Sequence, residues 1–233
     1  MPNGAVGALQ AAESNKVWYL RANRLFAGAL EGSVEQHAHI FRVIAFARKA
    51  QILGLGDTER VVFFVKRGVV RIARLTEDGN EVTLALLGPG DLFGEEMLFA
   101  KNPRTTVAVA LDDVLLCTAR ADDLLELMQS DAGMTLNVAK AMNERLGEAV
   151  TMMEDVAYAR ISDRLLHALR RIAAEYGVVT SDGVRISIRL THAELASIIA
   201  STRETVSLEL TRLINKHLLR MDGRHIVVLT GSA

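Results

Sequence analysis

Residues 191–207 read THAELASIIASTRETVS, which is the most informative segment of the chain. Leu195, Ile198 and Ile199 recur at three- and four-residue intervals, which predicts the buried side of a short helix. Ala196 is small enough for a second helix to cross it closely. The stretch therefore predicts two short helices that pack together across a tight turn.

The second helix of this pair is expected to begin on charged side chains. Thr202 can cap it, so that Arg203 and Glu204 lie in its exposed first turn. In a helix-turn-helix, that first turn points into the major groove of DNA. Arginine matches O6 and N7 of guanine, and glutamate accepts a hydrogen bond from N4 of cytosine. The pair therefore predicts base reading, with a merely solvated charged surface as the alternative.

The segments around this stretch complete a winged helix-turn-helix. An amphipathic helix and a short alternating strand precede it, and a hairpin that turns at Asp222-Gly223 follows it. The expected order is helix 162–176, strand 184–188, helices 191–199 and 202–215, and strands 218–221 and 226–229.

Positive charge gathers in the last third of the chain, although the formal net charge is only −1. Most of the acidic residues lie before this region. We therefore expect one domain, rather than the whole surface, to meet a polyanion. The basic residues of the region are Arg160, Arg164, Arg170, Arg171, Arg185, Arg189, Arg203, Arg212, Lys216, Arg220 and Arg224.

The region that follows the first 50 residues consists of short β-type runs. Turn residues separate them, and Asp78-Gly79 between two apolar runs indicates a hairpin. Many short strands at near-regular spacing predict a sandwich or a jelly-roll barrel. Residues 17–47 have helical spacing, which predicts short helices packed on this domain. The expected strands are 61–65, 69–75, 81–87, 105–111 and 114–118.

Residues 131–158 change to helical periodicity and predict a helix about 40 Å long. A helix of this length on a small domain favours a coiled-coil-like homodimer. The alternative is a helix that lies only across its own barrel. The apolar seam consists of Leu136, Met142 or Asn143, Leu146, Val150, Met153 and Ala157.

Composition sets the broad class of protein. About half of the 233 residues are hydrophobic and 24% are charged, which is ordinary for a soluble globular protein. No run is long enough for a membrane span, and residues 1–15 lack the pattern of a secretory signal. The single cysteine, Cys117, excludes an intrachain disulfide and is expected in a strand core. We expect a cytoplasmic protein.

These observations predict an α+β protein with four parts. A flexible leader (1–20) precedes an N-terminal β jelly-roll barrel (21–130). A long dimerisation helix (131–158) then leads to a C-terminal winged helix-turn-helix (159–233).

Residues 190–219 resemble the helix-turn-helix of the catabolite-activator (CRP/FNR) family, and 201–206, STRETV, closely match its signature. The resemblance extends over residues 21–229, and it implies that the jelly-roll barrel is of the cyclic-nucleotide-binding type and binds an effector. It implies a sequence-specific, dimeric transcription regulator, with double-stranded DNA and RNA polymerase as partners and with base reading by Arg203 and Glu204. Leu208 stands where the family commonly has another base-reading arginine, and Ala200 where it has a turn glycine. The expected DNA-binding residues are Thr191, Ser201, Thr202, Arg203, Glu204, Thr205, Ser207 and Leu208.

Residues 88–95 and 104–107 resemble the phosphate-binding cassette of the same family. The resemblance implies an effector site made by Gly94, Glu95, Arg104 and Thr105. Glu96 stands where the family has an apolar residue. Three possibilities stay open: cyclic AMP, another small anion such as 2-oxoglutarate, or no effector, with Glu95 and Arg104 as a structural ion pair. The anion remains open because the C-terminal half also resembles cyanobacterial nitrogen-control regulators.

Two other classes of protein compete with this prediction. One is a cyclic-nucleotide-binding module that acts on a protein partner. The other is a cupin-type metalloenzyme that uses His37 and His39. No acidic residue follows this pair within five positions, and residues two apart on a helix face apart. We therefore expect neither a metal site nor catalytic residues.

Overall fold

The computed structural model describes residues 19–20, 23–27, 36–99 and 103–230. The chain divides into two compact units: Met1–Val70 with Leu86–Leu146, and Arg71–Ala85 with Gly147–Ala233. Residues 1–18 of the predicted leader lie outside the described residues. Tyr19 and Leu20, at its end, are helical and buried.

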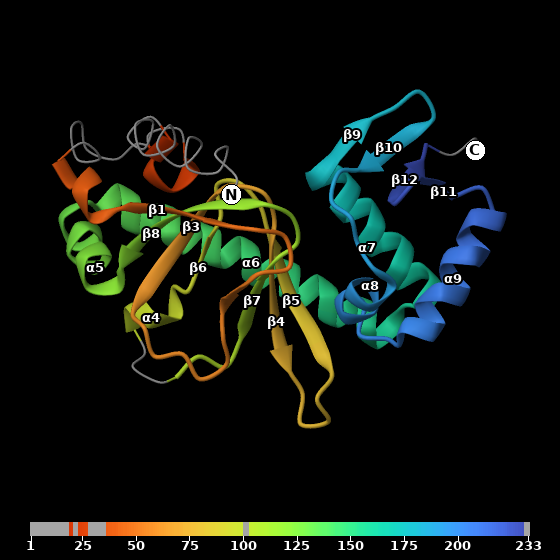
Figure 1. The fold of residues 1–233 in the computed structure, drawn as a ribbon, viewed down its shortest axis with the longest axis horizontal. Coiled ribbons are helices and arrows are strands. Elements are labelled where there is room, and N and C mark those ends of the chain that lie inside the picture. Colours follow the sequence, from red (N-terminus) through yellow and green to blue (C-terminus); the bar gives the residue numbers. More distant parts are fainter. Residues whose placement is uncertain (1–18, 21–22, 28–35, 100–102, 231–233) are drawn as a thin grey trace, which may run out of the picture. The chain divides into compact units, whose positions relative to one another are not determined.

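The strands of the N-terminal half form two four-stranded sheets (Figure 1). This arrangement confirms the predicted barrel, which pairs two sheets around one core. The first sheet has the order β1 (Arg42–Phe46), β8 (Val114–Arg120), β3 (Val61–Arg67) and β6 (Leu92–Phe93), and the second β2 (Gln51–Leu53), β7 (Val107–Ala110), β4 (Val70–Leu75) and β5 (Glu81–Leu87).

The predicted hairpin is present, whereas one predicted helical region contains a strand. Strands β4 and β5 flank the Asp78-Gly79 turn, and Gly79 has a φ of 78°, a conformation that glycine adopts without strain. The prediction of helices over 17–47 is wrong for Arg42–Phe46, which pairs antiparallel with β8. This strand buries little of its surface, so the alternation that marks a half-buried strand is weak.

Aromatic and aliphatic side chains fill the barrel. The rings of Phe26, Phe41 and Phe64 lie 5.6–5.7 Å apart between centroids. Cys117 is fully buried in β8, as expected. The smaller elements around the sheets are η1 (Arg24–Phe26), η2 (Ala38–Ile40), α4 (Glu96–Phe99) and α5 (Ala121–Ser130).

The long helix α6 (Ala132–Tyr158) has two apolar faces. Asp131 caps it, since its Oδ1 accepts from the backbone N–H of Met134 at 3.0 Å. Met134, Val138 and Ala141 are buried in the barrel core. The predicted seam is a different face, and its members Leu136, Leu146, Val150 and Met153 are 46–70% exposed. The seam is therefore exposed in the single chain.

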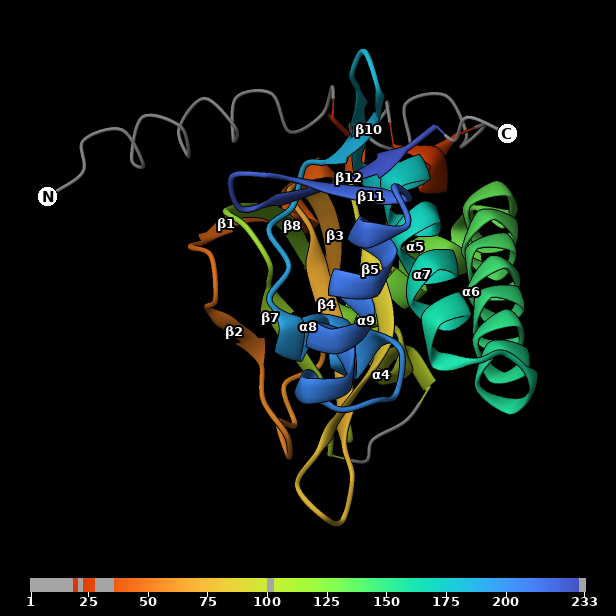
Figure 2. The ribbon, with the colours of Figure 1, turned by 90° about the vertical axis from the view of Figure 1, so that its right-hand side faces the viewer.

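The C-terminal part has the predicted winged helix-turn-helix order, with one additional strand (Figure 2). Its four strands pair in the order β11-β12-β10-β9. No helix in the described part of the chain is long and apolar enough to cross a membrane. The elements are α7 (Ile161–Tyr176), β9 (Gly177–Val179), β10 (Gly183–Ile186), α8 (His192–Ile198), α9 (Arg203–Asn215), β11 (Leu219–Asp222) and β12 (His225–Leu229).

Candidate nucleic-acid interface and effector site

A tight turn joins α8 to α9. Ala200 adopts a φ of 50°, so this alanine takes the left-handed conformation that a turn glycine would adopt without strain. The backbone N–H of Ser201 donates to the carbonyl of Ala196 at 2.9 Å, the bond that closes a Schellman-type helix end. At the other end of α8, Thr191 and Glu194 form a capping box. Both ends of this short helix are therefore held by hydrogen bonds.

Buried side chains hold the two helices together. Leu195, Ile198 and Ile199 are at most 4% exposed, as their spacing predicts. On α9, Val206 and Leu210 are buried as well. The packing of these buried side chains therefore fixes which face of α9 is exposed.

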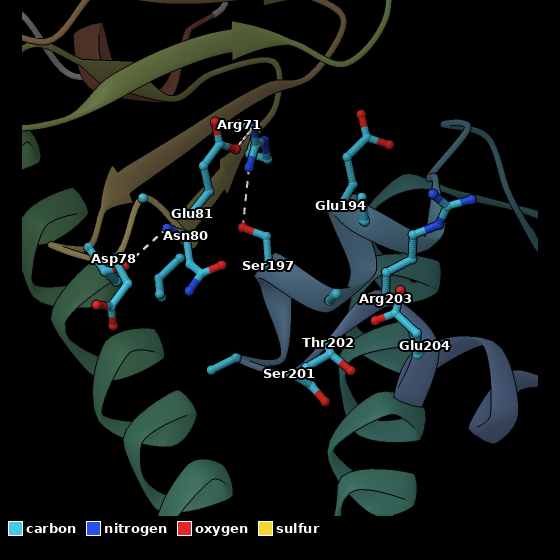
Figure 3. A pocket seen from close by; sticks show the side chains of 16 residues that line it. Arg71, Asp78, Asn80, Glu81, Glu194, Ser197, Ser201, Thr202, Arg203 and Glu204 are labelled. Carbon is cyan, nitrogen blue, oxygen red and sulfur yellow. Dashed lines mark hydrogen bonds and ion pairs between the residues drawn. The ribbon is translucent and has the colours of Figure 1, made fainter.

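The first turn of α9 presents an arginine and a glutamate. The hydroxyl of Thr202 accepts from the backbone N–H of Thr205 at 3.2 Å, so Thr202 is the N-cap. Arg203 and Glu204 follow at once and are exposed, beside Thr202 and Ser201 (Figure 3). Within the described part of the chain, neither charged side chain has an ion-pair partner at 4 Å or less. Their charges are free to meet a ligand.

Some of the predicted basic residues are engaged within the wing. The guanidinium of Arg220 donates to Asp182 at 2.8 and 3.1 Å. These hydrogen bonds hold the pKa of the Asp182 carboxyl below its usual value. Arg185 lies 3.7 Å from Asp222. Arg224 lies in the exposed turn between β11 and β12.

A polar cluster within the second unit joins the β4–β5 hairpin to α8 (Figure 3). Arg71 Nη1 donates to Ser197 Oγ at 3.2 Å and also pairs with Glu81. Thr83 Oγ1 lies 2.8 Å from the same hydroxyl. The hairpin, α8 and the start of α9 line a groove of about 870 Å³. Sequence reasoning missed this cluster because Arg71 and Ser197 are 126 positions apart.

The predicted effector cassette is built around Gly94. Gly94 has a φ of 80°, and a Cβ there would lie 2.8 Å from the carbonyl oxygen of Val61 and 3.0 Å from Arg104 Nη1. Glycine therefore allows the backbone to approach the guanidinium closely. Thr105, the next residue of the predicted set, is exposed.

Arg104 is fully buried and already has partners. Its Nη1 pairs with Glu96 Oε1 at 2.5 Å. Its Nη2 donates to the carbonyls of Val61 at 2.7 Å and Glu59 at 3.2 Å. The Glu96 carboxylate thus supplies the negative charge that an anionic ligand would otherwise bring.

Glu95 has a different partner from the one proposed for it. Its Oε1 lies 2.8 Å from Nη1 of Arg145 on α6, and Arg145 also donates to the carbonyl of Leu92. A Glu95–Arg104 structural pair is therefore wrong: the structure has the pairs Glu96–Arg104 and Glu95–Arg145. The signal for the first pair was present in the sequence, because Glu96 is a carboxylate at a position expected to be apolar.

The histidine pair does not build a metal site in the described residues. His39 Nδ1 lies 3.0 Å from the carbonyl of Gln36. Among the residues that the structure describes, no three His, Cys, Asp or Glu side chains lie close enough to hold one ion.

Comparisons with known proteins agree with this architecture. A cyclic nucleotide-binding domain matches residues 43–131, and a Crp-like helix-turn-helix domain matches residues 159–231. The transcriptional regulator SdrP of Thermus thermophilus is 32% identical over 165 residues, which cover 71% of this chain and 77% of that protein. A global nitrogen regulator of Nostoc is 29% identical over 203 residues, with 82% and 91% covered.

Comparison with solved structures identifies the same fold. A CRP/FNR-family transcriptional regulator from Thermus thermophilus superimposes with a TM-score of 0.67 at 29% identity, covering 81% of this chain and 93% of that one. Barrel, long helix and winged helix-turn-helix together define a DNA-binding transcription regulator. The chain belongs to the CRP/FNR family. The metalloenzyme and the module acting on a protein partner are not favoured.

Proposed function

We propose that this regulator binds a pseudo-palindromic DNA site as a homodimer in the cytoplasm, with Arg203 and Glu204 reading base edges and RNA polymerase as a further partner. One observation carries the proposal: both side chains are exposed on the capped first turn of α9 and lack an internal ion-pair partner among the described residues. Helices of this motif enter the major groove with this turn first.

The hydroxyl-bearing residues around the turn would position the helix on the DNA backbone. Ser201, Thr202 and Thr205 lie at the N-terminus of α9, and Thr191 lies at that of α8. Helix N-termini carry partial positive charge and free N–H groups, which suit phosphate oxygens. These contacts would fix the position of the helix along the DNA, whereas Arg203 and Glu204 would select the base sequence.

Substitution of Arg203 tests base reading. In Arg203→Ala, affinity for the preferred duplex should fall by about 1–3 kcal/mol, and the preference for one guanine should relax. The matched control is Arg224→Ala, which removes the same charge from the wing turn. It should weaken all duplexes alike and leave the sequence preference unchanged. A preference that survives in Arg203→Ala would overturn the assignment.

The homodimer is supported by the exposed seam on α6. Leu146 and Met153 are 64% and 70% exposed, and burying them against a second copy removes apolar surface from water. In sedimentation equilibrium, Leu146→Lys should be monomeric at concentrations where the wild type is dimeric. The control is Glu148→Lys, because a residue two positions along a helix lies on another face. A dimeric Leu146→Lys protein would refute this seam.

Any anionic effector, such as a cyclic nucleotide or 2-oxoglutarate, has to displace Glu96 from Arg104. Gly94, Glu95 and Thr105 would then lie beside the ligand. Calorimetry with cyclic AMP and with 2-oxoglutarate tests this on the wild type and on Glu96→Leu. Competition with an internal carboxylate predicts tighter binding to Glu96→Leu. If neither protein binds either anion, this site takes neither.

A further inference from the structure

One side chain on the DNA-facing helix departs from the pattern of its neighbours. Val206, Leu210 and Leu213 of α9 are 0–4% exposed, and Ile214 near its C-terminal end is half-buried. Leu208 is 62% exposed. A single exposed leucine is ordinary on most surfaces, but this one lies on an element whose exposed face meets DNA.

The position of Leu208 continues the base-reading surface. It follows Glu204 by four residues, so the two side chains lie one above the other on the same face of α9. Four residues advance a helix by about 6 Å, and stacked base pairs are about 3.4 Å apart. Leu208 therefore reaches base pairs within about two steps of those that Glu204 reaches.

Polar side chains near Leu208 are engaged elsewhere. The hydroxyl of Ser207 lies 2.7 Å from His192 Nδ1 and donates to the carbonyl of Arg203. Arg212, one turn farther along, pairs with Glu209 at 2.5 Å. The polar side chains next to Leu208 therefore already have partners within the protein, and the exposed apolar side chain of Leu208 is left to contact DNA.

We propose that Leu208 is a specificity-determining residue that selects thymine through contact with its C5 methyl group. Thymine is the only DNA base with a methyl on its major-groove edge, and apolar side chains recognise it there. Cytosine in its place offers an N4 donor that leucine cannot accept. The inference rests on the proposed DNA-binding function and assigns one thymine of each half-site, next to the pairs read by Arg203 and Glu204.

Removing the methyl group from DNA tests the contact directly. Each thymine of one selected half-site is replaced in turn by uracil, which keeps base pairing and lacks only the methyl. Binding of the full-length wild type should weaken about fourfold at one position, the change expected for one buried methyl group. The same substitution should have no effect on Leu208→Ala, because that variant no longer covers the methyl.

A converse variant makes the outcome decisive. Leu208→Arg should shift the preference at that position from thymine to guanine. Retained discrimination against uracil in Leu208→Ala would overturn the proposal, as would a wild type that is insensitive to uracil at every position. If either result occurs while Arg203→Ala still abolishes the guanine preference, only the role of Leu208 fails. If the wild type prefers no duplex, the proposed function fails with it.

Discussion

Replacing Glu96 by leucine should destabilise the barrel, because it removes the counter-charge of a fully buried arginine. Arg104 has no exposed side-chain surface, whereas the Glu96 side chain is 41% exposed. The variant leaves the guanidinium with the carbonyls of Val61 and Glu59 as partners but without a carboxylate. An uncompensated buried charge is among the costliest defects in a protein.

The size of the effect follows from this geometry. Breaking a buried ion pair costs about 3–5 kcal/mol, and a hydrogen bond to a charged group contributes about 1.5–3 kcal/mol. Because water reaches Glu96, the range for a hydrogen bond to a charged group applies. We therefore expect Glu96→Leu to lower the free energy of unfolding by about 2 kcal/mol. Arg104→Met removes the buried charge itself. The double variant Glu96→Leu/Arg104→Met should therefore be more stable than the sum of the two single losses predicts, by at least about 1 kcal/mol.

Urea unfolding at a fixed protein concentration measures the free energies, since unfolding of a dimer depends on concentration. Hydrogen exchange in strand β3 then assigns the change to the barrel rather than to the second unit. The control is Glu148→Leu, on a different element. Two results would show that Glu96 does not stabilise Arg104: a Glu96→Leu protein within about 0.5 kcal/mol of the wild type, or single losses that add without coupling.

Three further changes have defined outcomes. Ala200→Gly should raise stability by about 0.5–1 kcal/mol in thermal unfolding, because glycine relieves the left-handed strain; an unchanged or lower midpoint would contradict this. Thr202→Ala should cost about 1 kcal/mol and weaken DNA binding, whereas Thr211→Ala on the exposed face should cost less than about 0.5 kcal/mol. Burial raises the pKa of Tyr19 above its ordinary value, so its contribution to stability is present below about pH 10 and declines as the pH rises further. Unfolding midpoints at pH 9 and 11 should therefore fall more for the wild type than for Tyr19→Phe, and equal falls would exclude a buried phenol.

Local signals predicted the helix-turn-helix almost residue by residue. The apolar spacing of Leu195, Ile198 and Ile199, the cap at Thr202 and the exposed Arg203 all depend on residues within one or two helical turns. Because these interactions join residues close together in the chain, they can be recognised from the sequence pattern alone. The same holds for the hairpin at Asp78-Gly79, where turn chemistry and strand alternation agree.

Interactions across long separations were the part that sequence could not supply. Glu95 is bound by Arg145, 50 positions later, and Arg71 by Ser197, 126 positions later. Neither pair lies within one element, so no periodicity links its members. Strand β1 was missed for a related reason, because its pairing with β8, rather than its own weak alternation, defines it.

Selection of binding sites from random duplex DNA at low salt tests whether the protein binds DNA sequence-specifically as a symmetric dimer. Two copies of the α9 turn should enrich a pseudo-palindrome whose half-sites are centred about 10–10.5 base pairs apart, with a guanine in each half-site that Arg203→Ala no longer selects. Enrichment of a single unpaired half-site would contradict the symmetric dimer. No enrichment with cyclic AMP, with 2-oxoglutarate or without either would contradict sequence-specific binding.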